Sequence, residues 1–232
     1  MMGQSRRFLQ AGYVLPKYML PLWGKNVFQA VVSSFEHYFA SDVFIFICRK
    51  SENEVDFIKK NVEELRINKA KIITLNTDTE GQADTVWQGL KKIEWTVIED
   101  LFLFNIDTIR RNFRKPQSFN LGDGYLEVFR GEGEHWSFIK PGENFEVLET
   151  AEKNRISNYC SNGLYYFRNF DIFSESIAFA KHNQKLTYGE YYIAPLYNYL
   201  IYNGYKVRYS LASREEIIFC GTPDEYKNLV KY

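Results

Sequence analysis

Between residues 42 and 107, short apolar runs alternate with longer amphipathic stretches, and this order most restricts the fold. The apolar runs are DVFIFICR, AKIITLN and EDLFLFNID, at positions 42–49, 70–76 and 99–107. Between them lie SENEVDFIKKNVEEL (51–65) and ADTVWQGLKKI (83–93), whose apolar residues recur at helical spacing. Strand, helix, strand, helix, strand is the pattern of a parallel sheet covered by helices.

After residue 117 the pattern changes. Residues 125–153 are rich in turn residues with short β-like pieces, which favours an antiparallel insert. Two apolar helical stretches (170–182 and 192–204) and a strand (206–212) follow. We therefore expect an α/β protein, specifically a Rossmann-like three-layer α/β/α sandwich with a mostly parallel mixed sheet and an antiparallel insert. We expect one domain over residues 1–232.

Composition excludes several function classes. The formal net charge of zero argues against a general nucleic-acid coat, so any anion site must be local. The three cysteines, Cys48, Cys160 and Cys220, are widely spaced without a CxxC pair, which argues against structural zinc or a disulfide framework. No apolar run approaches the roughly 20 residues of a membrane span. The N-terminus lacks the apolar region of a secretory signal, so we expect a cytoplasmic protein without a membrane partner.

The N-terminal stretch MMGQSRRFLQAGYVLPKYMLP carries Gly3, Arg6, Arg7 and Lys17 and contains no acid. It is either an exposed basic arm or a loop shaped to hold an anion. Glycine loops of nucleotide-binding α/β sheets usually follow a first strand. Only two residues precede Gly3 here. Either a first strand has been lost from the sequence or the sheet lacks it, and we favour the loss.

Polar residues follow the expected strands at three places: residues 3–8, residues 77–85 and Asp107. Ligands bind doubly wound sheets at the carboxyl ends of the strands, so these segments are expected to converge. Asp107 by itself has two interpretations, the N-cap of a following helix or a ligand-binding carboxylate. The convergence of all three segments favours the second.

Five short motifs in a fixed order resemble the sugar-1-phosphate nucleotidylyltransferases, enzymes of the nucleotide-diphospho-sugar transferase fold. The matching residues are Gly3 and Arg7 with Pro16-Lys17, then Gly81-Gln82-Ala83, Asp107, Glu152-Lys153 ahead of Gly163-Leu164-Tyr165, and GTPDEY at 221–226. The resemblance covers nearly the whole chain. PKYMLP, FNIDT and HWSFIK look nearest to members that serve capsule and surface polysaccharides.

The resemblance implies substrates, a cofactor and site residues. It implies transfer from a nucleoside triphosphate to a sugar-1-phosphate or similar acceptor, with Mg²⁺ held by Asp107. It places nucleotide binding in residues 1–115 and sugar binding in 116–232. Catalytic roles fall on Arg7, Lys17 and Asp107, nucleotide binding on Gly3, Gln4, Ser5, Gly81, Gln82 and Ala83, and sugar-phosphate binding on Glu152, Lys153 and Gly163.

One departure concerns the metal. The family usually supplies a second metal-binding Asp two residues before its Gly-Thr-Pro, where this chain has Phe219. Phenylalanine cannot bind magnesium. Either Asp107 and the substrate phosphates suffice, or Glu216 or Asp224 substitutes, or activity is altered.

Other functions stay open at this point. A glycosyltransferase of the same fold typically carries an Asp-x-Asp motif, whereas NIDT has one Asp. A non-catalytic nucleotide-sugar-binding protein is favoured by Phe219, and an RNA-binding arm is disfavoured by the zero net charge. The loop around Tyr188, Glu190 and Tyr191 is a further candidate for sugar contact. The sequence leaves homo-oligomerisation, the base and the sugar open.

Overall fold

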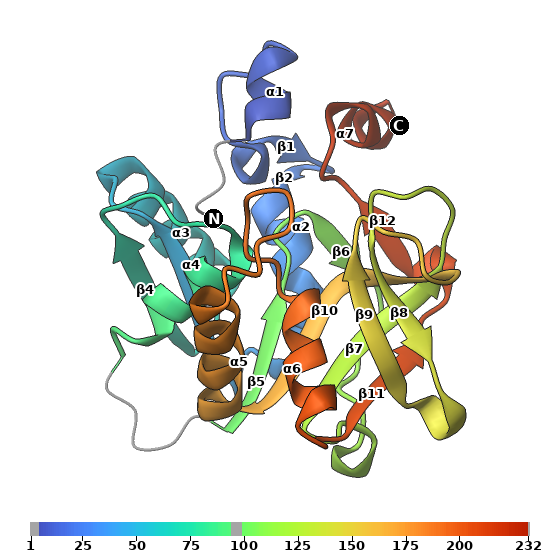
Figure 1. Cartoon of the computed structure of the whole chain (residues 1–232). Coiled ribbons are helices and arrows are strands. Elements are labelled where there is room, and N and C mark those ends of the chain that lie inside the picture. The colour runs from blue at the N-terminus through green and yellow to red at the C-terminus, as the bar shows by residue number, and fades with distance from the viewer. Residues whose placement is uncertain (1–4, 94–98, 232) are drawn as a thin grey trace. The chain divides into compact units, whose positions relative to one another are not determined.

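The computed structural model describes residues 5–93 and 99–231, which form two compact units (Figure 1). Unit 1 contains the described residues up to Asp78, Asn105–Arg114 and those from Glu215 onward. Unit 2 contains Thr79–Phe104, within the described residues, and Lys115–Arg214. Residues 79–104, expected in the nucleotide-binding half, thus group with the second half of the chain. The expectation of a single domain stays a prediction.

Among the described residues, unit 1 combines helices with three small two-stranded sheets. Its elements are α1 (Arg6–Gln10), η1 (Lys17–Met19), β1 (Pro21–Leu22), β2 (Lys25–Asn26), α2 (Val27–Val32), η2 (Ser33–Tyr38), β3 (Val43–Arg49), α3 (Glu52–Glu64), β4 (Lys69–Leu75), β6 (Thr108–Arg110), β12 (Ile217–Phe219) and α7 (Pro223–Val230). β3 pairs in parallel with β4, as expected for strands joined by a crossover helix. β1 pairs with β2 and β6 with β12, both antiparallel.

Local sequence explains the helices of unit 1. α3 buries Ile58 on one face and places Glu52 and Glu54 in its first turn, where acids favour the helix dipole. Thr222 is the N-cap of α7, and its side chain accepts from the backbone N–H of Glu225 in a capping box. The core beneath α3 is aromatic and aliphatic. It contains Tyr18, Phe28, Val32, Phe39, Phe46, Cys48, Ile58 and Ile67.

Unit 2 is built on a curved mixed sheet. Its elements are α4 (Gln82–Leu90), β5 (Glu99–Phe104), η3 (Ser118–Asn120), β7 (Gly124–Arg130), β8 (Ser137–Pro141), η4 (Glu143–Phe145), β9 (Val147–Glu152), β10 (Tyr159–Asn169), α5 (Phe170–His182), η5 (Ala194–Leu196), α6 (Tyr197–Tyr202) and β11 (Val207–Leu211). The strand order is β11-β7-β10-β8-β9, and β5 also pairs with β10. A bridge between Glu146 and Arg208 brings the two ends of this order together. η6 (Arg214–Glu216) leads the chain back to unit 1.

Helices α5 and α6 lie side by side against this sheet (Figure 1). The ring of Tyr197 in α6 stacks on Phe167 at 4.6 Å between centroids. The hydroxyl of Tyr197 donates toward the backbone carbonyls of Tyr125 and Tyr166, so its burial leaves no polar atom unpaired. Gly163, at φ +90°, lies in β10 where the register with β7 shifts between Ser161 and Tyr165.

The α/β class and the mixed sheet are confirmed. The described strands differ from expectation in the proportion of parallel pairs: only β3–β4 and β11–β7 are parallel, and the other pairs are antiparallel. The third expected strand, β5, pairs antiparallel with β10. Consecutive strands with short connections can only pair antiparallel, which explains the part of the sheet built from β8 and β9. No helix among the described residues is long and apolar enough to cross a membrane.

Candidate active site

An ion pair in unit 1 joins two of the expected catalytic residues. The ammonium Nζ of Lys17 donates to Oδ2 of Asp107 at 2.5 Å, across 90 positions of sequence. The two side chains are 22% and 25% exposed. A pair this accessible can exchange partners with an incoming phosphate at modest cost, whereas a fully buried pair would resist it.

The chain positions Lys17 through its neighbours in the N-terminal segment. Pro16 fixes the backbone directly before η1, and the backbone N–H of Lys17 donates to Oγ of Ser5 at 3.3 Å. Ser5 has a left-handed φ of +47° and directly precedes α1. The predicted phosphate-binding loop therefore continues as a short helix from Arg6. Ser5 and Lys17, both predicted from the sequence, lie next to one another.

Two other predicted residues of the N-terminal loop, Gly3 and Gln4, lie outside the described residues. Arg7 is described, and its side chain is exposed in α1. Its role at a triphosphate stays a prediction. Arg6 is exposed as well.

Asp107 lies in a turn immediately before β6, and its backbone is held by the partner strand. Its carbonyl accepts from the backbone N–H of Cys220 at 2.9 Å and from the Cys220 thiol at 3.2 Å. Because a strand follows Asp107, the interpretation of this residue as a helix N-cap is wrong. Its carboxylate serves the ion pair with Lys17 instead.

Gly221 makes space for the Asp107 carboxylate. A Cβ atom on Gly221 would lie 2.9 Å from Oδ2 and 3.3 Å from Cγ of Asp107. Any larger residue would press on the oxygen that faces Lys17. Sequence reasoning placed Gly221 in the GTPDEY motif but gave it no role. The spatial reason appears only when β12 lies beside the Asp107 turn.

The buried thiol of Cys220 adjoins the same turn. Burial raises its pKa to about 12, and the charge of Asp107 adds to this effect while that of Lys17 opposes it. A thiol with this pKa stays protonated at neutral pH and acts as a hydrogen-bond donor to Asp107.

The acids considered as substitutes for the missing second Asp have other partners. Glu216 forms an ion pair with Arg110, with 3.1 Å between Oε2 and Nη1. In the β6–β12 register that pair stands at the opposite end from Asp107, about four residues or roughly 13 Å away. Asp224 is 93% exposed and forms an ion pair with Lys227, one turn along α7. Phe219 pairs with Thr108 in the ladder.

The donor set around Asp107 can be tested for its fit to magnesium. The described residues contain no group of three or more His, Cys, Asp or Glu side chains that could hold a metal. Mg²⁺ commonly takes one or two carboxylates together with substrate phosphates and waters, so a single Asp107 suits a shared ion better than a protein cage. The residues present therefore fit a Mg²⁺ ion that is shared with the substrate phosphates.

In unit 2, the predicted base-binding turn is held by the backbone of Tyr191. The N–H of Tyr191 donates to the carbonyl of Glu80 at 2.6 Å, and the N–H of Ala83 donates to the carbonyl of Tyr191 at 2.9 Å. Gly81 has φ +114°, and a Cβ there would lie 2.7 Å from the nitrogen of Tyr191. Glycine is therefore required at this position. Gln82 directly follows as the first residue of α4.

A buried carboxylate supports the same turn. Asp84 is fully buried and accepts from the backbone N–H of Glu80 and from the side chain of Gln88. It also pairs with Lys181 at 2.9 Å, and Lys181 reaches Glu80 at 2.6 Å. Sequence reasoning did not single out Lys181 or Asp84. Nothing in the spacing of two residues 97 positions apart signals their contact.

The predicted sugar-phosphate residue Lys153 lies among tyrosines. Its Nζ donates to the hydroxyl of Tyr192 at 2.6 Å and stands 4.5 Å from the centre of that ring and 5.2 Å from the ring of Tyr188. Burial raises the pKa of Tyr192, while the bond from Lys153 works against this rise. The partner of the ammonium is therefore a neutral phenol at neutral pH.

Glu152, beside Lys153, is buried at the end of β9. It accepts a hydrogen bond from Oγ of Ser137. Burial raises its pKa above the ordinary range, while the Ser137 bond and the Lys153 charge lower it. Ser137 also lies 3.4 Å from the hydroxyl of Tyr165 in β10. Ser137 thus connects Tyr165 of the Gly163-Leu164-Tyr165 motif with Glu152. Gly163 lies at the irregularity of strand β10.

Comparison with known proteins shows which solved structures this chain is similar to. A nucleoside-diphosphate-sugar pyrophosphorylase from Vibrio cholerae is 43% identical over 100% of this chain and 98% of its own, with a TM-score of 0.94. An inositol-1-phosphate CTP transferase from T. maritima is 15% identical over 99% and 92%, with a TM-score of 0.72. A UDP-glucose pyrophosphorylase is 16% identical over 99% and 94%, with a TM-score of 0.71.

The last two similarities concern the fold. No protein-family model and no curated protein matches the chain. The similarity to the Vibrio cholerae protein covers both chains almost completely, and the motifs on which the sequence resemblance rested fall within it. The protein therefore belongs to the nucleoside-diphosphate-sugar pyrophosphorylases and is a nucleotidyltransferase.

Proposed function

We propose that the protein joins a nucleoside triphosphate to a sugar-1-phosphate, giving a nucleoside-diphosphate sugar and pyrophosphate. The observation that carries this proposal is the Lys17–Asp107 pair, which brings a cation and a metal-binding type of carboxylate together across 90 residues. The name of the 43% identical protein supports the same reaction.

The reaction depends on the positioning of the two substrates more than on proton transfer. An oxygen of the sugar phosphate attacks the α-phosphorus, a new P–O bond forms, and the bond to the departing pyrophosphate breaks. A phosphate dianion is already a nucleophile, so no general base is needed. Lys17 is a compact charge suited to the α-phosphate, where negative charge rearranges during the attack.

Asp107 would hold Mg²⁺ together with the phosphates. The ion supplies charge neutralisation and a template for the triphosphate. Gly221 leaves the carboxylate room, and the backbone N–H and thiol of Cys220 fix the turn that carries it. These contacts orient Asp107 within unit 1 before any substrate arrives.

Unit 2 would read the base and the acceptor. The backbone of Tyr191 holds the turn at Gly81–Ala83 through two hydrogen bonds. A turn held in this way can present backbone groups and the Gln82 amide to the edge of a base. Lys153 would bind the acceptor phosphate, and Glu152 would accept from sugar hydroxyls. Rigid donors favour recognition because little ordering entropy is lost on binding.

The decisive experiment measures pyrophosphate release from each of the four ribonucleoside triphosphates and dTTP, against a panel of phosphorylated sugars and polyols. We expect turnover with one base and one acceptor class, dependent on Mg²⁺. Transfer from a ready-made nucleotide sugar without pyrophosphate release would indicate a glycosyltransferase instead. Binding without turnover would indicate the non-catalytic alternative, which Phe219 favours.

The cellular role is a further part of the proposal. PKYMLP, FNIDT and HWSFIK support a product used for capsule or surface polysaccharide. Nucleoside triphosphates are cytoplasmic metabolites, and the proposed cytoplasmic location rests on that substrate. Loss of surface polysaccharide after deletion of the gene, restored by the intact chain and not by Asp107→Asn, is the expected result.

A further inference from the structure

One loop of unit 2 contacts both of its predicted binding segments through consecutive residues. The backbone of Tyr191 holds the Glu80–Ala83 turn by two hydrogen bonds of 2.6 and 2.9 Å. The side chain of the next residue, Tyr192, accepts the 2.6 Å bond from Lys153. The base turn and the acceptor-phosphate lysine are therefore joined by a single stretch of backbone.

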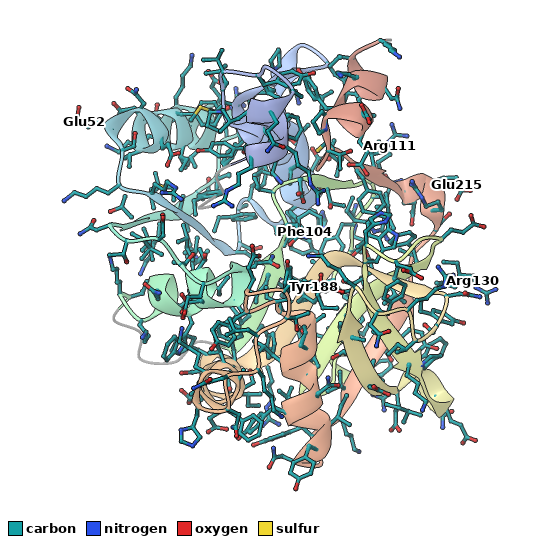
Figure 2. The ribbon with its side chains drawn as sticks, turned by 45° about the horizontal axis from the view of Figure 1, so that its top comes forward. Glu52, Phe104, Arg111, Arg130, Tyr188 and Glu215 are labelled. Atoms are coloured by element: carbon teal, nitrogen blue, oxygen red, sulfur yellow. The ribbon has the colours of Figure 1, made fainter. Side chains whose placement is uncertain are left out.

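The loop at 187–192 contains a tight turn that restricts its backbone. Thr187 and Glu190 exchange two backbone hydrogen bonds of 3.0 Å, and between them Tyr188 and Gly189 have φ values of +50° and +79°. Positive φ at both central residues is the signature of a tight two-residue hairpin turn. Figure 2 labels the exposed Tyr188 on this loop. A tight turn gives Tyr191 and Tyr192 little freedom to move independently.

Lys153 has few other constraints on its ammonium. Its own backbone is left-handed at φ +53°, with its N–H donating to the carbonyl of Trp136 at 2.8 Å. The four-carbon side chain is otherwise flexible, and cation–π contact with Tyr188 orients it only loosely. The phenol of Tyr192 is the directional contact that fixes Nζ.

We propose that Tyr192 is a positioning residue for Lys153, and that the loop at 187–192 makes the placement of Lys153 depend on the base turn. This inference deepens the proposed function and rests on it. Tyr192 acts through Lys153 and does not itself have to touch the substrate. Disturbing the base turn should therefore weaken acceptor binding, even though the acceptor does not contact that turn.

The first test compares Tyr192→Phe with Tyr202→Phe, which changes an exposed tyrosine of α6 in the same unit. Losing one hydrogen bond to a charged group should raise KM for the sugar phosphate about tenfold. The KM for the nucleoside triphosphate should stay within about twofold, since the phenylalanine keeps the backbone of the loop. An unchanged acceptor KM, or an equal rise in both constants, overturns the positioning role.

The second test is a double-mutant cycle with Gly81→Ala. The added Cβ would lie 2.7 Å from the Tyr191 nitrogen and must displace the loop. We expect Gly81→Ala to raise KM for both substrates. With Tyr192→Phe already present, it should add no more than about twofold to the acceptor KM, because the connection to Lys153 is already cut. Fully additive effects on the acceptor KM overturn the coupling.

A readout independent of activity separates this inference from the proposed function. Brief acetylation with acetic anhydride, followed by peptide mass spectrometry, measures the reactivity of Lys153. We expect Lys153 to react several-fold faster in Tyr192→Phe than in the wild type and in Tyr202→Phe, because its ammonium loses a directional partner. Equal reactivity overturns the positioning role. A clear difference in a chain that releases no pyrophosphate would instead overturn the proposed function alone.

Discussion

The two units each present a lysine, and the two lysines have different partners. In unit 1, Lys17 is paired with the carboxylate of Asp107, so the pair is neutral as a whole. In unit 2, the ammonium of Lys153 donates to the phenol of Tyr192, which carries no charge to compensate it. A neutral pair is suited to a magnesium-bearing triphosphate, which brings both signs of charge. A lysine held by a neutral phenol is suited to a simple phosphate anion.

Asp107→Asn should show the largest effect, because it leaves Lys17 without its anion and removes the charge that attracts magnesium. We expect magnesium-dependent pyrophosphate release to fall by about 10³-fold or more, with the fold intact. A magnesium titration of pyrophosphate release measures it. Asp56→Asn, which changes an exposed carboxylate in the same unit, is the control. Substantial activity of Asp107→Asn at low magnesium would rule out the metal role.

Lys17→Ala should come next. Loss of a charge-stabilising donor at the reacting phosphate typically costs about 10²–10³ in kcat. The free energy of unfolding should change by only about 1 kcal/mol, because both partners are in part solvated. Steady-state kinetics and urea unfolding measure the two effects. Lys60→Ala, which removes an exposed ion pair with Glu64, should leave kcat unchanged. A near-normal kcat for Lys17→Ala would show that another cation serves the α-phosphate.

Lys153→Met should have a smaller effect, and one on KM for the sugar phosphate more than on kcat. Methionine keeps the apolar contact with the tyrosine rings and loses the charge, so KM for the sugar phosphate should rise about 10- to 30-fold with little change in kcat. Lys185→Met is the matched control, since that lysine also lies over a ring, Phe179, outside the predicted site. A loss confined to kcat would place Lys153 at the reacting phosphate and remove the contrast between the units.

Glu152→Gln tests the buried carboxylate through pH. Burial raises the pKa of Glu152 above its ordinary 4.5, so the folded state binds more protons than the unfolded state above that pH. Stability from this group is present below pH 4.5 and lost as pH rises through the folded pKa. We therefore expect a higher Tm than wild type at pH 8 and a similar Tm at pH 4. Glu149→Gln, on the exposed face of β9, should show no such difference.

A lower Tm of Glu152→Gln at pH 8 would mean that the carboxylate is stabilised in the fold. In that case the hydrogen bond from Ser137 would outweigh the cost of burial.

Sequence alone predicted the elements well where periodicity is strong. The run SENEVDFIKKNVEEL became α3, and FDIFSESIAFAKH became α5 over the same residues, 170–182. Amphipathic spacing and local capping decide such elements, and both are local properties. Sequence motifs also indicated Lys17 and Asp107, because residue type and order in the chain carry the family pattern. The nucleotidyltransferase family itself followed from five short motifs and is confirmed.

Tertiary structure decided the contacts that no spacing encodes. Asp107 had two interpretations because the residues after it could equally have begun a helix. Instead, β6 pairs with β12, and Asp107 lies in a turn whose carbonyl accepts from the N–H of Cys220. The sequence gives no sign that Gly81 and Gly221 are required for different reasons. Gly81 is required by its positive φ and by the nearby backbone of Tyr191, whereas Gly221 is required by the nearby carboxylate of Asp107. Such requirements arise from atoms more than 100 residues away. Local sequence sets which conformations a segment prefers, whereas close packing between distant segments sets which side chain has room.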